Sequence, residues 1–264
     1  MLPPPRSVSR WLLAALLWNG ASAFGATPDD PDGRALLQAA QRTIAAYHAG
    51  QPRHDGVVRV VYFHPSDRDP LPNYAERLDR VLGDVCDFYR DGLRRFGLAN
   101  EGLPLERKDG RLVLHVVRGK RPASDYTHDS GHPIALEARA ALRDVFNFDR
   151  EHVLMIHALC RKEPDGRYVF DAPYYGSGSH RAGICHAADC ELLDPRLLTE
   201  TRRRIVFTEH YYSRRDETVA LFNSMYLGGT AHELGHGLGL FHDAGMAAEE
   251  KYGTALMGGG NLTY

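Results

Sequence analysis

The sequence has 264 residues, of which 43% are hydrophobic and 25% charged, and its formal net charge is −2. This apolar content excludes intrinsic disorder for most of the chain, since disordered segments combine low hydrophobicity with high net charge. The near-neutral balance argues against nucleic acid as the main partner, because phosphate binding needs a basic surface. Fourteen histidines are many for this length, so their spacing carries information.

The first 26 residues have the pattern of an export signal. Residues 1–10 carry two arginines and no acid, residues 11–18 are eight consecutive apolar residues, and small residues follow. A bilayer span needs about 20 apolar residues, which excludes a membrane anchor here. We therefore expect cleavage of residues 1–26 and a mature protein that is secreted, periplasmic or extracellular, with no membrane span.

Helical and strand patterns then alternate along the chain. Apolar residues every three or four positions predict helices, and β-branched or aromatic runs predict buried strands. Alternation of this kind implies a largely parallel α/β sheet, and because no linker interrupts it, residues 27–264 are predicted to form one domain. The predicted helices are 32–49, 72–98 and 134–145, and the predicted strands are 57–63, 111–117, 152–159 and 205–208.

Three segments have a different character. Residues 161–200 are rich in Gly, Ser, His and Asp, which predicts loops with one edge strand near 179–185. Ser213 and Asp216 have the spacing of a helix capping box, so a helix is predicted to begin there and to continue through Tyr226. The three arginines at 202–204 predict a solvated face.

Four cysteines, Cys86, Cys160, Cys185 and Cys190, predict two disulfides if the chain is exported, because that compartment is oxidising. Cys185 and Cys190 are near enough in sequence to close a small loop. This favours Cys185–Cys190 together with Cys86–Cys160. A cysteine-rich zinc site is disfavoured because no C-x-x-C pair is present.

The segment HELGHGLGLFH at residues 232–242 follows the pattern H-E-x-x-H-x-x-G-x-x-H. His232 and His236 are four residues apart and share one face of a helix, so both imidazoles can reach one ion. His242 would point away if the helix continued, and Gly239 stands where a helix can end. Three neutral imidazoles with one open position suit a catalytic zinc ion. We therefore predict one Zn²⁺ bound by His232, His236 and His242.

Glu233 directly follows the first of these histidines and is the candidate general base. Zinc lowers the pKa of a bound water and polarises a substrate carbonyl. A carboxylate beside that water takes its proton and passes it to the leaving nitrogen. The residue pattern thus predicts hydrolysis of peptide bonds.

These residues resemble the zinc signature of the metzincin clan of metalloendopeptidases. The clan also has a methionine turn beneath the zinc, and Met257 in the segment ALMG matches it. Asp243 after the third histidine is similar to the adamalysin-like branch, which implies a structural hydrogen-bonding role, although the subfamily stays unassigned. The implied fold is α/β, with a twisted, mostly parallel sheet and two long helices in an upper subdomain, and a small irregular lower subdomain that contains the Met-turn.

The sequence also departs from the clan pattern. Gly259 stands two residues past Met257, where some members have a tyrosine that approaches the zinc. The clan usually has a helix after the Met-turn, but only seven residues follow Met257. Either the lower subdomain is minimal or the sequence is incomplete at its C-terminus.

A second metal, a structural zinc or calcium, has weak candidates in His180, His186, Asp189 and Asp194, which lack tight ligand spacing. A disulfide-closed surface loop explains the segment more simply. The resemblance also implies that the neighbouring edge strand, near residues 177–184, pairs with an extended peptide by β-augmentation.

The sequence therefore predicts a secreted zinc metalloendopeptidase, a hydrolase that binds a protein or peptide substrate in extended form. Two alternatives remain: a zinc-bearing adhesion or binding module that hydrolyses nothing, and a metalloamidase acting on cell-wall peptides. The residues do not indicate the cleavage specificity, the activation mechanism or the oligomeric state.

Overall fold

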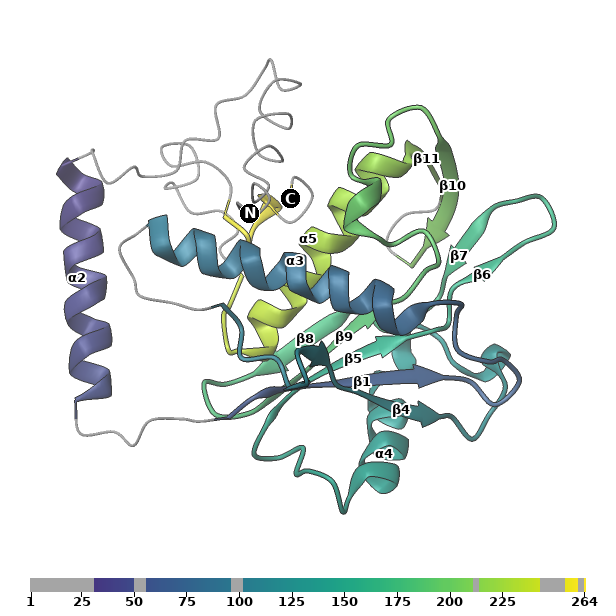
Figure 1. The fold of residues 1–264 in the computed structure, drawn as a ribbon, viewed down its shortest axis with the longest axis horizontal. Coiled ribbons are helices and arrows are strands. Elements are labelled where there is room, and N and C mark those ends of the chain that lie inside the picture. The colour runs from purple at the N-terminus through teal and green to yellow at the C-terminus, as the bar shows by residue number, and fades with distance from the viewer. Residues whose placement is uncertain (1–30, 50–55, 96–101, 211–213, 243–254, 261–263) are drawn as a thin grey trace, which may run out of the picture.

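A computed structural model describes residues 31–49, 56–95, 102–210, 214–242, 255–260 and 264 (Figure 1). The predicted signal, residues 1–26, lies outside the described residues. None of the described helices is long and apolar enough to cross a membrane.

A five-stranded sheet forms the centre of the molecule. Its strand order is β4-β1-β5-β9-β8, in which four strands are parallel and β8 runs antiparallel to β9 at the edge. Two of the interior strands, β1 and β5, are buried nearly throughout because their β-branched and aromatic side chains face helices on both sides. The predicted mostly parallel α/β sheet is thus confirmed. The strands are β1 Val58–His64, β4 Leu114–Arg118, β5 His152–His157, β8 Tyr175–Gly178 and β9 Gly183–Ala188.

Two long helices, α3 and α5, cover one face of this sheet, and α4 covers the other (Figure 1). The helix α3 packs through a stripe of apolar residues that recur every three or four positions, as its sequence predicts. The helix α2 lies to one side of the sheet (Figure 1). The helices are α2 Pro31–His48, α3 Tyr74–Arg95, α4 Gly131–Leu142 and α5 Val219–Gly237.

A second sheet, with order β11-β10-β7-β6, lies beside the first half of α5 (Figure 1). Its strands are β6 Arg161–Lys162, β7 Tyr168–Phe170, β10 Arg204–Glu209 and β11 Arg215–Thr218. A short hairpin joins β2 Arg107–Lys108 to β3 Arg111–Leu112, and single 3-10 turns occupy Ala123–Asp125, His128–Ser130 and Pro195–Leu197.

The loop prediction for residues 161–200 is wrong over much of its length, because β6, β7, β8 and β9 all lie there. The edge strand is β8, and the predicted edge segment 179–185 is a turn followed by the interior strand β9. The glycines of this hairpin have a low strand propensity, so the sequence pattern does not predict its strands. These glycines are required because the strands approach a helix closely, as described below.

The helix predicted from Ser213 through Tyr226 is confirmed only from Val219 onward, and its predicted start is wrong. Residues 215–218 form β11, which pairs with β10, and the cap is Thr218, whose hydroxyl accepts a hydrogen bond of 3.1 Å from the backbone N–H of Leu221. The polar sequence of β11 suits a half-exposed edge strand, so its charges imitate a helix start.

The predicted disulfides are not formed, because all four cysteines are free thiols. Cys185 lies on β9 and packs against α5, whereas Cys190 lies beyond the end of that strand, and extended backbone carries the two apart. The Cys190 thiol is instead within hydrogen-bond reach of Cys160. Cys86, on α3, donates to the carbonyl of Leu103.

Candidate metal centre

The last turns of α5 and the segment after it bring three imidazoles together. The Nε2 atoms of His232 and His236 are 3.1 Å apart, and the Nε2 atom of His242 is 3.2 Å from the first and 3.0 Å from the second. Tetrahedral coordination at a Zn–N distance near 2.05 Å places ligand nitrogens about 3.3 Å from one another. The spacing of the three nitrogens therefore fits a zinc ion.

The tautomers of two of these histidines follow from their other ring nitrogen. Nδ1 of His232 lies 2.7 Å from the carbonyl oxygen of Leu256, and Nδ1 of His236 lies 2.8 Å from that of Leu240. A carbonyl only accepts, so each Nδ1 carries the proton and each Nε2 presents a lone pair to the shared centre. Burial lowers the pKa of His232, and the two neighbouring imidazoles add to this, although the hydrogen bond to Leu256 opposes it. The neutral form, which a metal needs, is favoured.

The helix α5 ends at Gly237, before His242, so the chain can turn and bring the third imidazole back to the other two. Gly239 has a φ of 93°, in the left-handed region, as the sequence predicts. The N–H of Gly239 donates to the carbonyl of His236 at 2.9 Å, and the N–H of Leu240 donates to that of Gly235, also at 2.9 Å. These paired bonds close the helix and turn the chain back toward the imidazoles. A Cβ on Gly239 would in addition lie 2.9 Å from the Cα of Ser179.

Glu233 lies between the two helical histidines and points toward the edge strand. Burial raises the pKa of Glu233 to about 7, and a hydrogen bond from the backbone N–H of Gly176 opposes that rise. A carboxyl group poised near neutral pH can both accept and return a proton. The chemistry expected of a general base is therefore available at this position.

Met257 is buried beneath the same turn of α5. A Cβ added at Gly235 would lie 2.5 Å from its sulfur, so the absence of a side chain at Gly235 admits the methionine. The N–H of Gly258 donates to the carbonyl of Ala255 at 3.0 Å, which forms the tight turn expected around Met257. Asp243, the other supporting residue in the sequence prediction, lies outside the described residues.

Glycines hold the edge hairpin against the end of α5. A Cβ at Gly178 or Gly183 would overlap the carbonyl oxygen of Gly237, and a Cβ at Gly176 would overlap that of Glu233. Because side chains alternate along a strand, Tyr175 and Ser177 point away from α5. They line a groove of about 400 Å³ on the α4 side of β8, together with His132, Arg139 and Asp149.

The residues considered for a second metal have other partners. Asp189 is fully buried, forms an ion pair with Arg77 at 2.6 Å, and accepts a hydrogen bond from Tyr62 at 3.0 Å. Asp194 pairs with Arg196 and Arg80 and caps the turn Pro195–Leu197. Burial raises its pKa, but the hydrogen bonds from these arginines outweigh burial and hold the pKa well below the usual range. His186 is buried against His157. Within the described residues these side chains do not converge on a common point, whereas His232, His236 and His242 do.

The sequence does not reveal several groups of this centre. Leu240 and Leu256 act through their carbonyl oxygens, and Gly176 through its N–H, so no side chain marks them. Only the run YGSG at residues 175–178, with glycine at every second position, hints at close packing on one face.

No protein-family model and no curated protein matches the chain. Wild-type OgpA from Akkermansia muciniphila is similar in structure, with a TM-score of 0.62 and 30% identity over 81% of this chain and 56% of OgpA. Catalytically inactive OgpA in complex with an O-glycopeptide substrate, glycodrosocin, has a TM-score of 0.60 and 28% identity, over 80% of this chain and 56% of that protein. Archaemetzincin from Methanopyrus kandleri has a TM-score of only 0.30 and 17% identity, over 74% of this chain and 81% of that protein. This likeness is too slight to bear on the fold.

The chain thus spans a little over half the length of OgpA, at 56%. The chain shares its mixed α/β architecture with OgpA, and this likeness supports a zinc metallopeptidase fold.

Proposed function

We propose that this chain is a zinc-dependent peptidase in which His232, His236 and His242 hold the metal and Glu233 is the general base. The observation that carries the proposal is the convergence of three Nε2 atoms at 3.0–3.2 Å, beside a half-buried carboxyl group on the same helical turn. A structural zinc site has four protein ligands, whereas three leave a position for water or substrate.

Each group of the proposed centre has a separate role in peptide hydrolysis. Zinc bound at the three imidazoles would supply a Lewis acid for the substrate carbonyl and lower the pKa of an attacking water. Glu233 takes the proton of that water and returns it to the leaving nitrogen. The Gly176 N–H holds the Glu233 carboxylate in place, and the carbonyls of Leu240 and Leu256 fix the ring orientation of two ligands.

The edge strand supports an extended peptide as the substrate. One side of β8 is paired with β9, and its other side is free of a strand partner in the described residues. A peptide that pairs there alternates its side chains between the α5 face and the groove beside Tyr175 and Ser177. A volume of about 400 Å³ lies within the range of small-molecule sites. Since OgpA is seen with an O-glycopeptide, we propose peptides bearing a sugar on Ser or Thr as the substrate class.

The test compares a peptide with and without one O-linked sugar, using the zinc-loaded chain, Glu233→Gln and the control Glu76→Gln, which changes an exposed carboxylate at the start of α3. We expect Glu233→Gln to retain one zinc per chain and to lose about 10²-fold or more in kcat/KM, whereas the control keeps full activity. Equal hydrolysis by Glu233→Gln would exclude the mechanism. Cleavage of the bare peptide alone would exclude the glycopeptide class, and no hydrolysis of either peptide by the zinc-loaded wild type would favour a binding module.

We further propose that the chain is exported and that residues 1–26 are removed, leaving residues 27–264 as a single peptidase domain. The charged, apolar and small-residue order of the first 26 residues supports this. N-terminal sequencing of the protein recovered from the medium or periplasm tests it, and an intact Met1 on the exported protein would contradict it.

A further inference from the structure

A second cavity lies in the other sheet, away from the imidazoles. It occupies about 230 Å³ between the β6–β7 turn and the first residues of β10, where β7 begins too late to pair with them. The adjacent strand β11 runs directly into the start of α5, and 13 residues of helix separate Val219 from His232, a distance of about 20 Å along the axis. The cavity is therefore separate from the metal centre.

The lining of this cavity is strongly basic in a chain whose overall charge is −2. Among the described residues the lining contains a single carboxylate, that of Asp165, which accepts a hydrogen bond of 3.0 Å from the backbone N–H of Arg167. The cationic side chains in the lining are Lys162, Arg167, Arg203, Arg204 and Arg214.

Two of the five cations contact a carboxylate, and Lys162 lies over the ring of Tyr168, 5.4 Å from its centroid. Arg204 turns toward Asp216 at 2.8 Å, and Arg167 contacts Asp165 at 3.5 Å and the hydroxyl of Thr208 at 3.3 Å. In the part of the chain that the structure describes, Lys162, Arg203 and Arg214 form no ion pair. Three positive charges around one small cavity thus have no carboxylate within ion-pair distance among the described residues.

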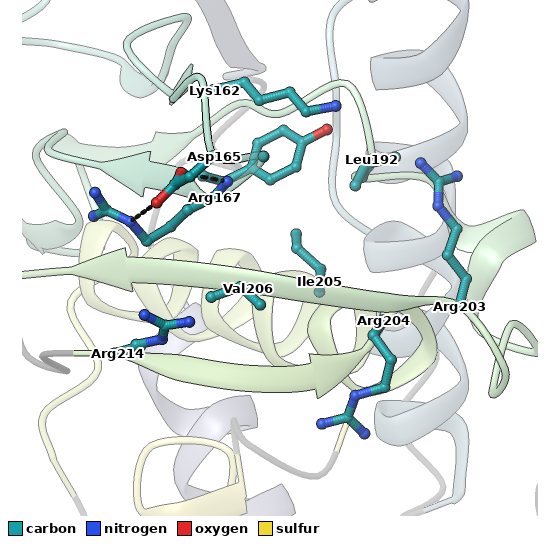
Figure 2. Close-up of a pocket in the computed structure, with 11 residues that line it drawn as sticks. Lys162, Asp165, Arg167, Leu192, Arg203, Arg204, Ile205, Val206 and Arg214 are labelled. Carbon is teal, nitrogen blue, oxygen red and sulfur yellow. Dashed lines mark hydrogen bonds and ion pairs between the residues drawn. The ribbon is translucent and has the colours of Figure 1, made fainter.

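Figure 2 shows how these groups surround the space. Arg167 and Arg214 lie on one side, Lys162 and Arg203 lie on the other, and Ile205 and Val206 lie between them on β10. Like charges gathered in this way repel one another, and the repulsion is relieved when an anion binds. The guanidinium fork matches phosphate and carboxylate oxygens, and a multiply charged anion meets several cations at once.

We propose that this basic cavity, lined by Lys162, Arg203 and Arg214, is a binding site for a multiply charged oxyanion group such as a phosphate or sulfate ester. Its volume of about 230 Å³ is below the range of drug-sized ligands, so it takes the charged group and leaves the rest of a larger ligand outside. The site does not depend on the proposed peptidase activity. It gives a specific use to Arg203, one of the three arginines at 202–204 that as a sequence predict only a solvated face.

The test measures binding of inorganic phosphate, with sulfate and chloride at the same ionic strength as comparisons, by titration calorimetry on the full chain. The cavity variant is Arg203→Gln with Arg214→Gln. The matched control is Arg202→Gln with Arg150→Gln, which removes the same charge from two exposed arginines outside the cavity. Both cavity residues are exposed, so the variant should fold, and circular dichroism checks this.

We expect the wild type and the control to bind phosphate more tightly than chloride, and the cavity variant to bind it at least tenfold more weakly. Lys162→Gln alone should weaken binding by a smaller factor. A phosphate response that chloride reproduces, or equal affinity in the cavity and control variants, would overturn the proposal. Glucose 6-phosphate and a 6-sulfated N-acetylglucosamine then show whether the anion is free or carried on a sugar. If either sugar ester binds more tightly than free phosphate or sulfate, the site is assigned to a sugar-borne group. Hydrolysis of a short uncharged peptide should be the same in all variants, which separates this site from the peptidase proposal.

Discussion

The backbone N–H of Gly176 donates a hydrogen bond to the carboxylate of Glu233. The same glycine lies so close to α5 that an added Cβ would overlap the carbonyl oxygen of Glu233 and lie 2.9 Å from the Cβ of His236. One residue of the edge strand thus sets both the position of the candidate base and the distance between strand and helix.

Gly176→Ala should therefore impair the site without changing a titratable group. The methyl group must push β8 from α5, which costs about 1–3 kcal/mol in unfolding free energy, and it moves the hydrogen bond to Glu233. We expect kcat/KM to fall at least tenfold while zinc content is unchanged. The control is Gly83→Ala in α3, where the added methyl meets nothing within 4 Å and should stabilise the helix by about 0.5–1 kcal/mol. Full activity in Gly176→Ala would contradict this role.

Removal of the metal should lower the thermal stability of the chain. A ligand present at a thousand times its dissociation constant stabilises the native state by about 4 kcal/mol, which corresponds to a Tm difference on the order of 10 °C for a domain of this size. Calorimetric scans with and without a chelator measure the difference. His236→Ala lacks one of the three ligand nitrogens, so the chelator should have little further effect on it. An equal chelator effect in both proteins would show that the metal lies elsewhere.

Acid should destabilise the fold through the buried His157–His186 pair, whose ring nitrogens lie 2.9 Å apart. Burial lowers the pKa of His186 from 6.5 to about 4, and burial together with His186 lowers that of His157. Below pH 6.5 the unfolded chain gains a proton on His186 while the native chain stays neutral until about pH 4. The contribution of His186 to the free energy of unfolding is therefore fully present above pH 6.5 and is lost toward pH 4, and it amounts to about 3 kcal/mol.

Urea unfolding between pH 4 and pH 7 measures this slope. His186→Asn should flatten it, whereas His132→Asn, which changes an exposed histidine on α4, should leave it unchanged. A slope that His186→Asn does not alter would assign the acid sensitivity to other groups.

Phe241 is 87% exposed directly before the third histidine of the triad. A large apolar side chain at the rim of the centre is placed to be covered by substrate. Phe241→Ala should raise KM by about fivefold with kcat little changed, equivalent to about 1 kcal/mol of lost apolar contact. Val145→Ala, at a residue 55% exposed beyond α4, is the control. An unchanged KM for the peptide substrate would mean that Phe241 does not contact it.

The sequence predicts those parts of the structure in which side-chain pattern and backbone geometry agree. The buried strands β1 and β5 are apolar runs, and α3 has a single apolar stripe, so periodicity identifies all three. In the centre, the spacing of His232, His236 and Gly239 follows directly from helix geometry, and the structure brings the imidazoles together.

Other parts escape prediction because tertiary contacts determine them. The strand β8 consists of Tyr, Gly, Ser and Gly, a poor strand sequence, and it is extended because only glycine fits against the end of α5. The strand β11 is highly charged because it lies at an edge, which imitates a helix start. The wrong disulfide pairing has the same origin, since sequence distance between Cys185 and Cys190 says nothing of a strand that separates them.

The bond from His232 to the carbonyl of Leu256 joins residues 24 positions apart in the chain. This bond couples the position of His232, a proposed zinc ligand, to the turn around Met257. A chain cut before Ala255 would keep all three histidines, yet His232 would lose the acceptor that fixes its tautomer. Metal affinity is therefore a measure of whether the C-terminal segment is docked, and zinc retention can serve as an assay for the folding of that segment.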